Sequence, residues 1–245
     1  MFSSIVMLHN VSDSPGYESL KPYSITTKTF IQLLDFIERN NYRTITFNDI
    51  GYEKKDLSFY KKKIILTFDD CSKSLFDFAI PELIKRDLSA VFYIPTSHIG
   101  SYNSWDMEIG KKQIEIMSES DLKELIKLKM EVGSHAHHHI NLKNLDRTEV
   151  EKEVTISKKI IENITGTKVI SFAYPFGIVP ERYKQILTVA DYLYASAIYH
   201  PFQNNLALRR FIYHNGDTKK TLSLKFSRLY HWYRSFRDPL HSIIY

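Results

Sequence analysis

Four histidines lie within five consecutive positions of the stretch EVGSHAHHHINL, at His135, His137, His138 and His139. Neutral imidazole is the commonest metal ligand among protein side chains. His135 and His139 are four residues apart, a spacing at which a helical turn or a tight loop brings two side chains to one ion. His137 and His138 have no partner at this spacing within the stretch. The pattern therefore predicts a metal site that includes His135 and His139.

Two adjacent aspartates, Asp69 and Asp70, follow the apolar run KIILTF. Successive strand residues face opposite sides, so both carboxylates reach one site only where the strand ends and the chain turns. Two close carboxylates repel each other unless a cation neutralises one, and a metal on one leaves the other free as a base. One aspartate, two imidazoles and water would form a catalytic site with an open position. Zinc is the first expectation, and cobalt, nickel, iron or manganese suit the same ligands.

The histidine pattern differs from the helical zinc site of metalloproteases. That site requires glutamate in the second position of H-E-x-x-H, where this chain has Ala136. A metalloprotease is therefore disfavoured.

Apolar runs rich in β-branched residues alternate with helical periodicities along the chain. Strands are expected at 4–8, 42–47, 63–68, 90–94, 130–134, 169–174, 192–198 and 206–213. Helices are expected at 27–40, 72–87, 118–128, 146–166 and 180–191. Repeated strand–helix units predict parallel strands covered by helices. We expect an α/β fold, a distorted (β/α) barrel with seven or eight mostly parallel strands, in one domain that spans 1–245.

Several polar residues follow directly after expected strands. His9 follows the first strand, Asp69 follows the run KIILTF, and His135 follows the run MEVGS. Enzymes with this fold keep their catalytic groups at the carboxyl ends of the strands. These residues are therefore expected to meet at one end of the barrel.

The motifs LTFDD, GSHAHHHINL and SFAYPFG, in this order, resemble those of the polysaccharide deacetylase family, the NodB-homology domain of carbohydrate esterase family four. The resemblance covers most of the chain, from His9 to Arg210. It implies a distorted (β/α) barrel and a divalent metal. It also implies hydrolysis of N-acetyl groups, or less often O-acetyl groups, on sugars.

The resemblance implies a role for each matching residue. Asp69 matches the catalytic base and Asp70 the metal-binding aspartate, while His135 and His139 match the two metal-binding histidines. The N-terminal VMLHNVSD is similar to the circularly permuted branch of the family, in which His9 would be the general acid.

The chain departs from the family motifs at three positions. Cys71 stands where members usually have glycine, and Ala136 replaces a serine or threonine. Ala173 stands where the third motif commonly holds an arginine that pairs with the base aspartate. Arg210 is expected to take over this pairing, with Arg209 as the second candidate; an ordinary salt bridge at the surface or the strand edge is the alternative for both.

The oxyanion of the reaction is expected on the metal and on the backbone N–H of Phe176, where family members often have tyrosine. The irregular stretch 95–117 is expected to form a loop over the site. Tyr102 and Trp105 in this loop, and Pro175 in the third motif, are candidates for contact with the sugar. Ordinary packing is the alternative for them.

Composition and charge suggest a location and partners. The formal charge is +5 without a long basic block, and no nucleic-acid partner is expected. The C-terminal segment, about 218–237, mixes basic and aromatic residues and predicts an amphipathic helix packed on the domain; peripheral membrane contact is the alternative. A single cysteine excludes an intrachain disulfide. No signal peptide or transmembrane segment is seen, so a cytoplasmic location is expected.

Three functions are open on this basis. The first is a metal-dependent deacetylase that acts on an acetylated sugar or glycan precursor. The second keeps the site but hydrolyses another amide, such as a formamide or a cyclic imide. The third is a non-catalytic member that binds a glycan or a protein, although such a protein would not need a base and an acid.

Overall fold

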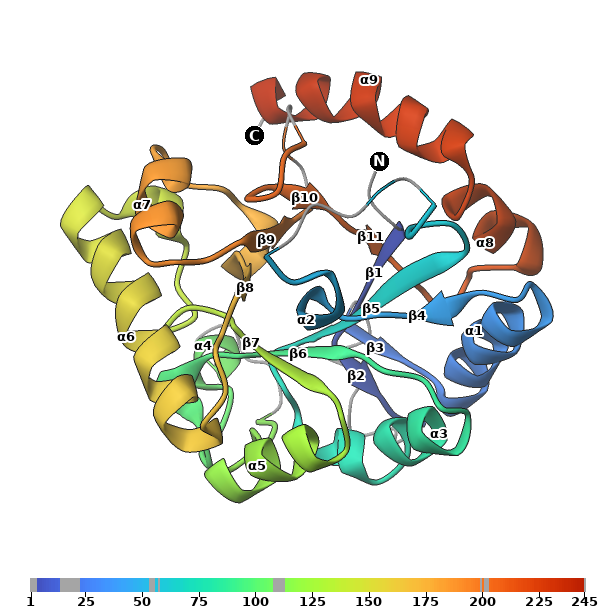
Figure 1. Cartoon of the computed structure of the whole chain (residues 1–245), viewed down its shortest axis with the longest axis horizontal. Coiled ribbons are helices and arrows are strands. Elements are labelled where there is room, and N and C mark those ends of the chain that lie inside the picture. Colours follow the sequence, from blue (N-terminus) through green and yellow to red (C-terminus); the bar gives the residue numbers. More distant parts are fainter. Residues whose placement is uncertain are drawn as a thin grey trace.

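The computed structural model describes residues 4–13, 23–52, 56, 58–107, 113–198, 200 and 203–244. Parallel strands surround a central axis, as Figure 1 shows. The sheet comprises β1 (Ser4–Leu8), β4 (Arg43–Thr44), β5 (Lys63–Asp69), β6 (Val91–Ile94), β7 (Glu131–Ser134), β8 (Ser171–Ala173), β9 (Tyr194–Ala197), β10 (Leu208–Arg209) and β11 (Phe211–Ile212). Their order is β10-β9-β8-β7-β6-β5-β1-β11, with β4 beside β5. The expected distorted (β/α) barrel is confirmed.

The helices of the described residues are α1 (Thr27–Arg39), α2 (Phe47–Ile50), α3 (Ala79–Lys85), α4 (Ser104–Met107), α5 (Glu119–Lys127), α6 (Arg147–Thr165), α7 (Tyr183–Val189), α8 (Lys219–Lys225) and α9 (Arg228–Ile244). Most of them form a ring outside the strands, whereas α2 lies near the centre of the view in Figure 1. Short 3-10 turns follow some strands: η2 (Lys73–Phe76), η3 (Thr96–His98), η4 (Leu142–Asn144) and η5 (Pro175–Gly177). The strands β2 (Asn10–Val11) and β3 (Ser24–Ile25) form a separate parallel pair.

The short helix α2 covers the amino ends of the barrel strands, at the centre of the view in Figure 1. Phe47 stacks on Tyr194, with ring centroids 5.0 Å apart, and the Tyr194 hydroxyl donates to the Gly51 carbonyl at 2.9 Å. The carboxylate of Glu131 accepts from the Asn48 N–H at 2.8 Å. Apolar residues of β1, β5, β6, β8, β9 and β10 fill the interior above α2. This end of the barrel is therefore a packed core.

A single extended run of chain connects the two edges of the sheet. Strand β10 pairs with β9, and β11 pairs with β1, while only Arg210 separates β10 from β11. The Arg210 N–H still donates to the Ala197 carbonyl, at 3.0 Å. The barrel is thus closed by one segment that changes its partner strand at Arg210, and we call 208–212 the seam.

The structure corrects several expected boundaries. The strand expected at 42–47 is only β4, because Thr46 caps α2 and Phe47 begins it. The strand expected at 206–213 is divided at Arg210 because its two halves pair with different strands. The helix expected at 72–87 is the turn η2 followed by α3. The helix expected at about 218–237 is α8 and then α9, which begins at Arg228 and extends to Ile244. The stretch 95–117, expected to be irregular, contains η3 and α4.

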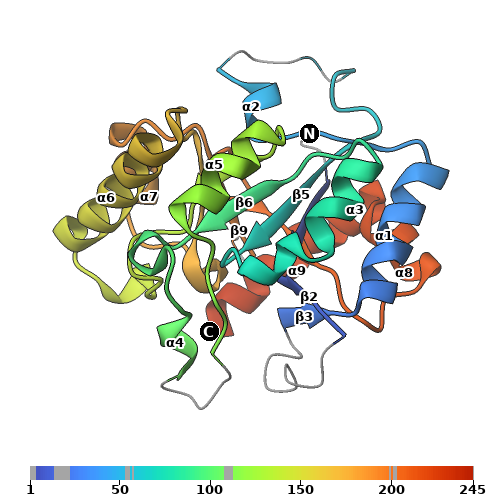
Figure 2. The ribbon, with the colours of Figure 1, turned by 90° about the horizontal axis from the view of Figure 1, so that it is seen from below.

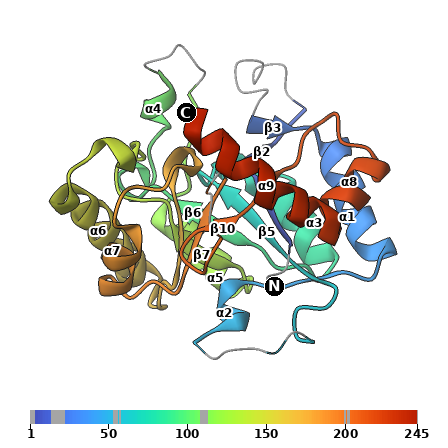
Figure 3. The same ribbon diagram turned by 90° about the horizontal axis from the view of Figure 1, so that it is seen from above.

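The two ends of the barrel differ, as Figures 2 and 3 show: α2 lies at one end, and α4 and β3 lie at the other. Helix α9 runs along the side of the barrel, and its outer face carries Leu229, Trp232 and Phe236, each at least 60% exposed. Within the described residues, no helix combines the length and apolar character that crossing a bilayer requires. Contact of the C-terminal segment with a membrane surface stays a prediction.

The barrel interior leaves no room for a side chain at Gly133 of β7. A Cβ atom there would lie 2.5 Å from Cε1 of Tyr93 and 2.7 Å from Oγ of Ser171. We expect Gly133→Ala to lower the free energy of unfolding by about 1–3 kcal/mol, because neighbours in a packed core must shift. Gly216→Ala is the matched control, since no atom lies within 4 Å of its Cβ position. Urea denaturation measures both, and equal stabilities would contradict the packing argument.

Candidate functional site

The two adjacent aspartates face one cavity because the chain turns sharply at the end of β5. Asp70 has φ +66° and Cys71 has φ +51°, both in the left-handed region. Such a conformation costs a non-glycine residue about 1–2 kcal/mol. The Cys71 side chain is fully buried in the core outside the barrel, and its carbonyl accepts from the Met117 N–H at 3.0 Å. The family that this motif resembles usually has glycine here, which adopts this conformation without strain.

The histidine stretch forms a tight loop whose first and last histidines differ in surroundings from the two between them. Ala136 and His139 have φ +64° and +54°, so the loop is bent at both places. His135 and His139 are buried and point into the cavity, whereas the His138 side chain is 57% exposed. His137 Nδ1 lies 2.8 Å from the Thr96 hydroxyl. Two imidazoles therefore face the cavity and two are bound to the surrounding scaffold.

One buried carboxylate on α6 holds this loop. Oε2 of Glu153 accepts from the backbone N–H groups of His137 and His138, at 2.9 and 2.8 Å, and Oε1 lies 2.6 Å from Nδ1 of His138. The Glu153 side chain is 8% exposed. Hydrogen bonds to an ionised acceptor are stronger than those between neutral groups. Glu153 thus fixes the backbone that carries both inward-facing imidazoles.

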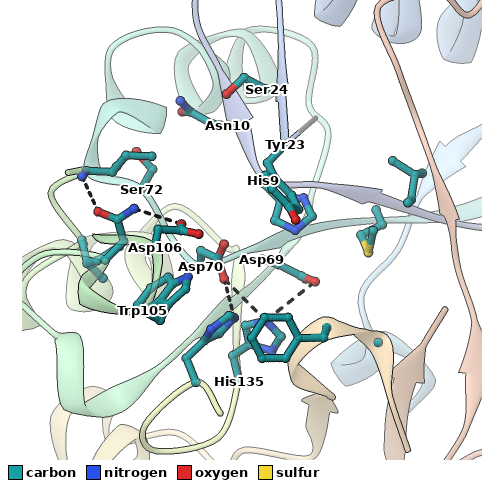
Figure 4. Close-up of a pocket in the computed structure, with 18 of the residues that line it drawn as sticks. His9, Asn10, Tyr23, Ser24, Asp69, Asp70, Ser72, Trp105, Asp106 and His135 are labelled. Carbon is teal, nitrogen blue, oxygen red and sulfur yellow. Dashed lines mark hydrogen bonds and ion pairs between the residues drawn. The ribbon is translucent and has the colours of Figure 1, made fainter. Parts of the chain in front are cut away.

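Asp70, His135 and His139 each offer one ligand atom, and these three atoms lie within 4.8 Å of one another. Figure 4 shows Asp70 and His135 of this cluster side by side. Asp70 Oδ1 lies 3.1 Å from His139 Nε2 and 3.5 Å from His135 Nε2. This oxygen is buried and has no hydrogen-bond partner among the described residues. A buried oxygen without a partner is costly unless a cation binds it.

The protonation states also suit a cation. His135 Nδ1 lies 2.7 Å from the Ala173 carbonyl and donates to it, which directs the lone pair of Nε2 toward the cluster. Burial lowers the pKa of His135 to about 4, so the imidazole is neutral at pH 7. Burial would raise the pKa of Asp70, but His139 and the other nearby histidines hold it below its usual value. Two imidazole nitrogens and one carboxylate form a ligand set that fits a divalent metal.

Asp69 is bound by an arginine fork. Arg210 Nη1 and Nη2 donate to Asp69 Oδ1 and Oδ2, at 2.6 and 2.7 Å, and Nη1 also donates to the Thr67 hydroxyl at 3.1 Å. Both side chains are buried. Burial would raise the pKa of Asp69, but Arg210 keeps it below its usual value. Asp69 is therefore ionised beside the ligand cluster, with Oδ2 3.9 Å from His135 Nε2.

Arg209, the second candidate for this pairing, turns the other way. Its Nε lies 3.1 Å from Oδ2 of Asp238 on α9. Adjacent residues of an extended strand face opposite sides, so one arginine enters the barrel and the other faces the helix outside.

A cavity of about 440 Å³ opens above the two aspartates. Figure 4 shows His9 and Tyr23 on one side of it, and their rings are 5.3 Å apart in an edge-to-face contact. Trp105 of α4 packs on His139, with ring centroids 4.2 Å apart. Apolar side chains of Met7, Ile198 and Ile212 line another part of the wall.

Of the remaining expected site residues, Phe176 lines the cavity, whereas Tyr102 and Pro175 do not. Phe176 lines the cavity with a half-exposed ring and has φ +60°, so its peptide groups are turned relative to those of β8. Tyr102 is half-exposed and pairs with Glu115 in an isolated bridge, and Pro175 is buried at the start of η5.

Three relevant residues were not anticipated from the sequence. His214 lines the cavity, and because it follows the expected strand 206–213, the strand-end rule could have identified it. Asp106 in α4 also lines the cavity, and its Oδ2 accepts from the Asn103 amide at 3.0 Å. The sequence gives no indication of the role of Glu153, because a glutamate within a charged amphipathic helix is expected to face solvent.

Comparisons with known proteins agree with the motifs. A sequence profile of the family described as polysaccharide deacetylase matches residues 57–195. The chain is 23% identical over 188 residues to a poly-beta-1,6-N-acetyl-D-glucosamine N-deacetylase of Staphylococcus aureus (strain MRSA252). That match covers 74% of this chain and 63% of the relative, so the chain spans less than two thirds of its length.

Solved structures share the fold. The deacetylase PplD of Streptococcus pyogenes, in complex with acetate, has a TM-score of 0.77 at 19% identity, with 93% of this chain and 99% of that chain covered. A polysaccharide deacetylase from Bacillus cereus has a TM-score of 0.76 at 24% identity, covering 93% of this chain and 69% of that one. At such identities the likeness shows a common barrel.

The ligand cluster can be tested by metal content. We expect Asp70→Ala and His135→Ala to weaken zinc binding by more than about 100-fold, because each variant loses a direct ligand. Loss of a residue that only hydrogen-bonds to a ligand weakens metal binding by about 10–100-fold. His138→Ala is the matched control, since its imidazole faces away from the cluster. Elemental analysis and zinc titration of the folded variants measure this. Stoichiometric metal in Asp70→Ala would show that the cluster is not the metal site.

Proposed function

The chain belongs to the polysaccharide deacetylase family, and we propose that it hydrolyses the N-acetyl groups of an acetylated glycan in the cavity above Asp69 and Asp70. The observation that carries this proposal is the juxtaposition of the Asp69–Arg210 pair with three converging ligand atoms. The activity in the name of the staphylococcal relative supports N-acetylglucosamine as the sugar unit. An O-acetyl group is a second possible substrate of the same site.

Asp70, His135 and His139 would hold a divalent metal, with zinc as the first candidate. When bound, such an ion supplies Lewis acidity, which polarises an acyl carbonyl and makes water more acidic. The hydrogen bond from His135 to Ala173 and the Glu153 anchor keep both imidazoles oriented without further movement.

Asp69 is the proposed base. Each carboxylate oxygen can accept two hydrogen bonds, so binding to Arg210 leaves a lone pair on Oδ2 that faces the cluster. Arg210 fixes the orientation of the carboxylate and keeps it ionised. An ionised carboxylate at this point can take a proton from an attacking water.

The remaining groups act on the acyl group and on the leaving nitrogen. The backbone N–H of Phe176 would donate to the oxyanion, and a backbone donor serves equally with phenylalanine or tyrosine at this position. His9, which lies across the cavity from His135 in Figure 4, would protonate the departing amine. The family match at 57–195 does not include His9, so its role as the acid of a permuted motif is part of the proposal.

The second candidate, hydrolysis of a formamide or a cyclic imide, uses the same groups, and a panel of N-acetyl, N-formyl and imide substrates separates it. A non-catalytic role is disfavoured by the Asp69–Arg210 pair, since a site that only binds a ligand does not need an oriented, ionised carboxylate beside the ligand cluster. Hydrolysis of none of these substrates by metal-loaded protein would favour the non-catalytic role.

Replacement of the base separates chemistry from metal binding. We expect Asp69→Asn to keep zinc and to lower kcat for N-acetylglucosamine oligomers by about 10²–10⁴-fold, the usual contribution of a general base. Asp106→Asn is the matched control, because it also removes a cavity carboxylate but leaves the ligand cluster intact. Released acetate and bound metal are measured together. Unchanged acetate release from Asp69→Asn would refute the assignment.

Replacement of the proposed acid should depend on the leaving group. We expect His9→Ala to lower hydrolysis of N-acetyl sugars by about 10²–10⁴-fold, since an amine must be protonated as it leaves. Hydrolysis of 4-nitrophenyl acetate should fall much less, because nitrophenolate leaves without a proton. The two rates are compared in one protein preparation. An equal loss on both substrates would argue against His9 as the acid.

A further inference from the structure

Arg210 is the only residue between β10 and β11. Its backbone N–H and carbonyl therefore have other hydrogen-bond partners than those of a residue within a strand pair. Its N–H binds the β9 side of the seam, through the Ala197 carbonyl at 3.0 Å. Its carbonyl accepts from a side chain instead: Nη1 of Arg234 on α9 donates to it at 3.1 Å. An arginine of the last helix therefore binds the backbone of the residue that holds Asp69.

The same guanidinium reaches a second backbone group at the site. Nη2 of Arg234 donates to the carbonyl of Ile198, the residue that follows β9 and lines the cavity. The Ile198 side chain packs against Gly177, where a Cβ atom would lie 2.3 Å from its Cγ1. One fork thus connects the end of β9 with the centre of the seam.

Arg234 is itself fixed by a fully buried carboxylate. Its Nε donates to both oxygens of Asp238, at 2.7 and 2.9 Å, and Arg209 Nε lies 3.1 Å from Asp238 Oδ2. Asp238 is 0% exposed and Arg234 4% exposed. Apolar side chains of similar volume often stabilise a fold as well as a buried ion cluster does, or better. A contribution to geometry therefore explains this cluster better than a contribution to stability.

We propose that Arg234 is a positioning residue for the hydrolysis: it fixes the seam at Arg210 and so directs the Arg210 guanidinium onto Asp69. Arg234 does not line the cavity and touches neither Asp69 nor the ligand cluster. The inference rests on the proposed function, because it takes Asp69 as the base. Helix α9 then belongs to the active site, although it lies outside the barrel wall.

Kinetics of Arg234→Met provide the first test. We expect kcat to fall about 10–100-fold with KM changed less than about twofold, since a shift of the base by a fraction of an ångström affects the reaction more than binding. Arg234→Lys keeps a positive charge beside Asp238 but cannot reach both carbonyls, and it should lose about 3–10-fold. If Arg234→Met does not fold, an unchanged kcat in Arg234→Lys overturns the proposal.

Two control variants separate positioning from loss of stability. Arg86→Met removes another largely buried guanidinium, which bridges Asp35 and Glu82 far from the cavity, and should lower stability but not kcat. Trp232→Ala removes an exposed side chain from the outer face of α9 and should change neither. Equal loss of kcat in Arg86→Met and Arg234→Met would mean that Arg234 acts through stability alone.

A double-mutant cycle shows whether Arg234 acts through Arg210. Arg210→Met already releases Asp69, so we expect Arg234→Met to cause no further loss of kcat in that background. Amide hydrogen exchange across 208–212 should accelerate in Arg234→Met, while exchange in β5 stays unchanged. Independent, multiplicative losses of kcat would overturn the proposal.

The outcomes also separate this inference from the proposed function. If Asp69→Asn and Arg210→Met both keep full deacetylase activity, the proposed function fails. If both lose activity while Arg234→Met and Arg234→Lys keep it, only the positioning role of Arg234 fails.

Discussion

The ion pair between Asp69 and Arg210 is the constraint on which the site depends. It joins residues 141 positions apart across the inside of the barrel, where both side chains are buried. Either charge alone would be strongly unfavourable there, so each requires the other. Because the pair is neutral overall, the net charge that remains beside it is that of Asp70. A divalent ion held by Asp70 and the two imidazoles would keep a net positive charge, which would favour a developing oxyanion.

The ligand loop shows a second use of a buried charge. Ala136 and His139 both have left-handed backbone conformations. Glu153 stabilises this loop conformation by accepting from the N–H groups of the two residues between them, His137 and His138. The histidines that do not face the cavity therefore still matter, because their backbone carries the anchor. Preorganised ligands of this kind need not rearrange when a metal binds.

Much of this could be predicted from the sequence, and the limits have physical reasons. Strand positions and the residues after them were visible because buried parallel strands read as apolar runs. The division of 206–213 at Arg210 was not visible, since local sequence does not say which strand an extended residue pairs with. Choosing Arg210 over Arg209 required the direction of side chains at the seam. Glu153 and Arg234 were not anticipated, because their tasks depend on contacts between helix and strand that periodicity does not encode.

The seam has a consequence for synthesis on the ribosome. The ribosome synthesises β1 and β5 early, and these two strands pair with each other. Asp69 therefore leaves the ribosome long before Arg210, its partner in the ion pair. Until residue 210 leaves the exit tunnel, the nascent chain carries an aspartate whose burial has no compensating charge, and β1 has an open edge. Premature termination before the seam at 208–212 would thus yield a barrel that cannot close and an Asp69 without its partner charge.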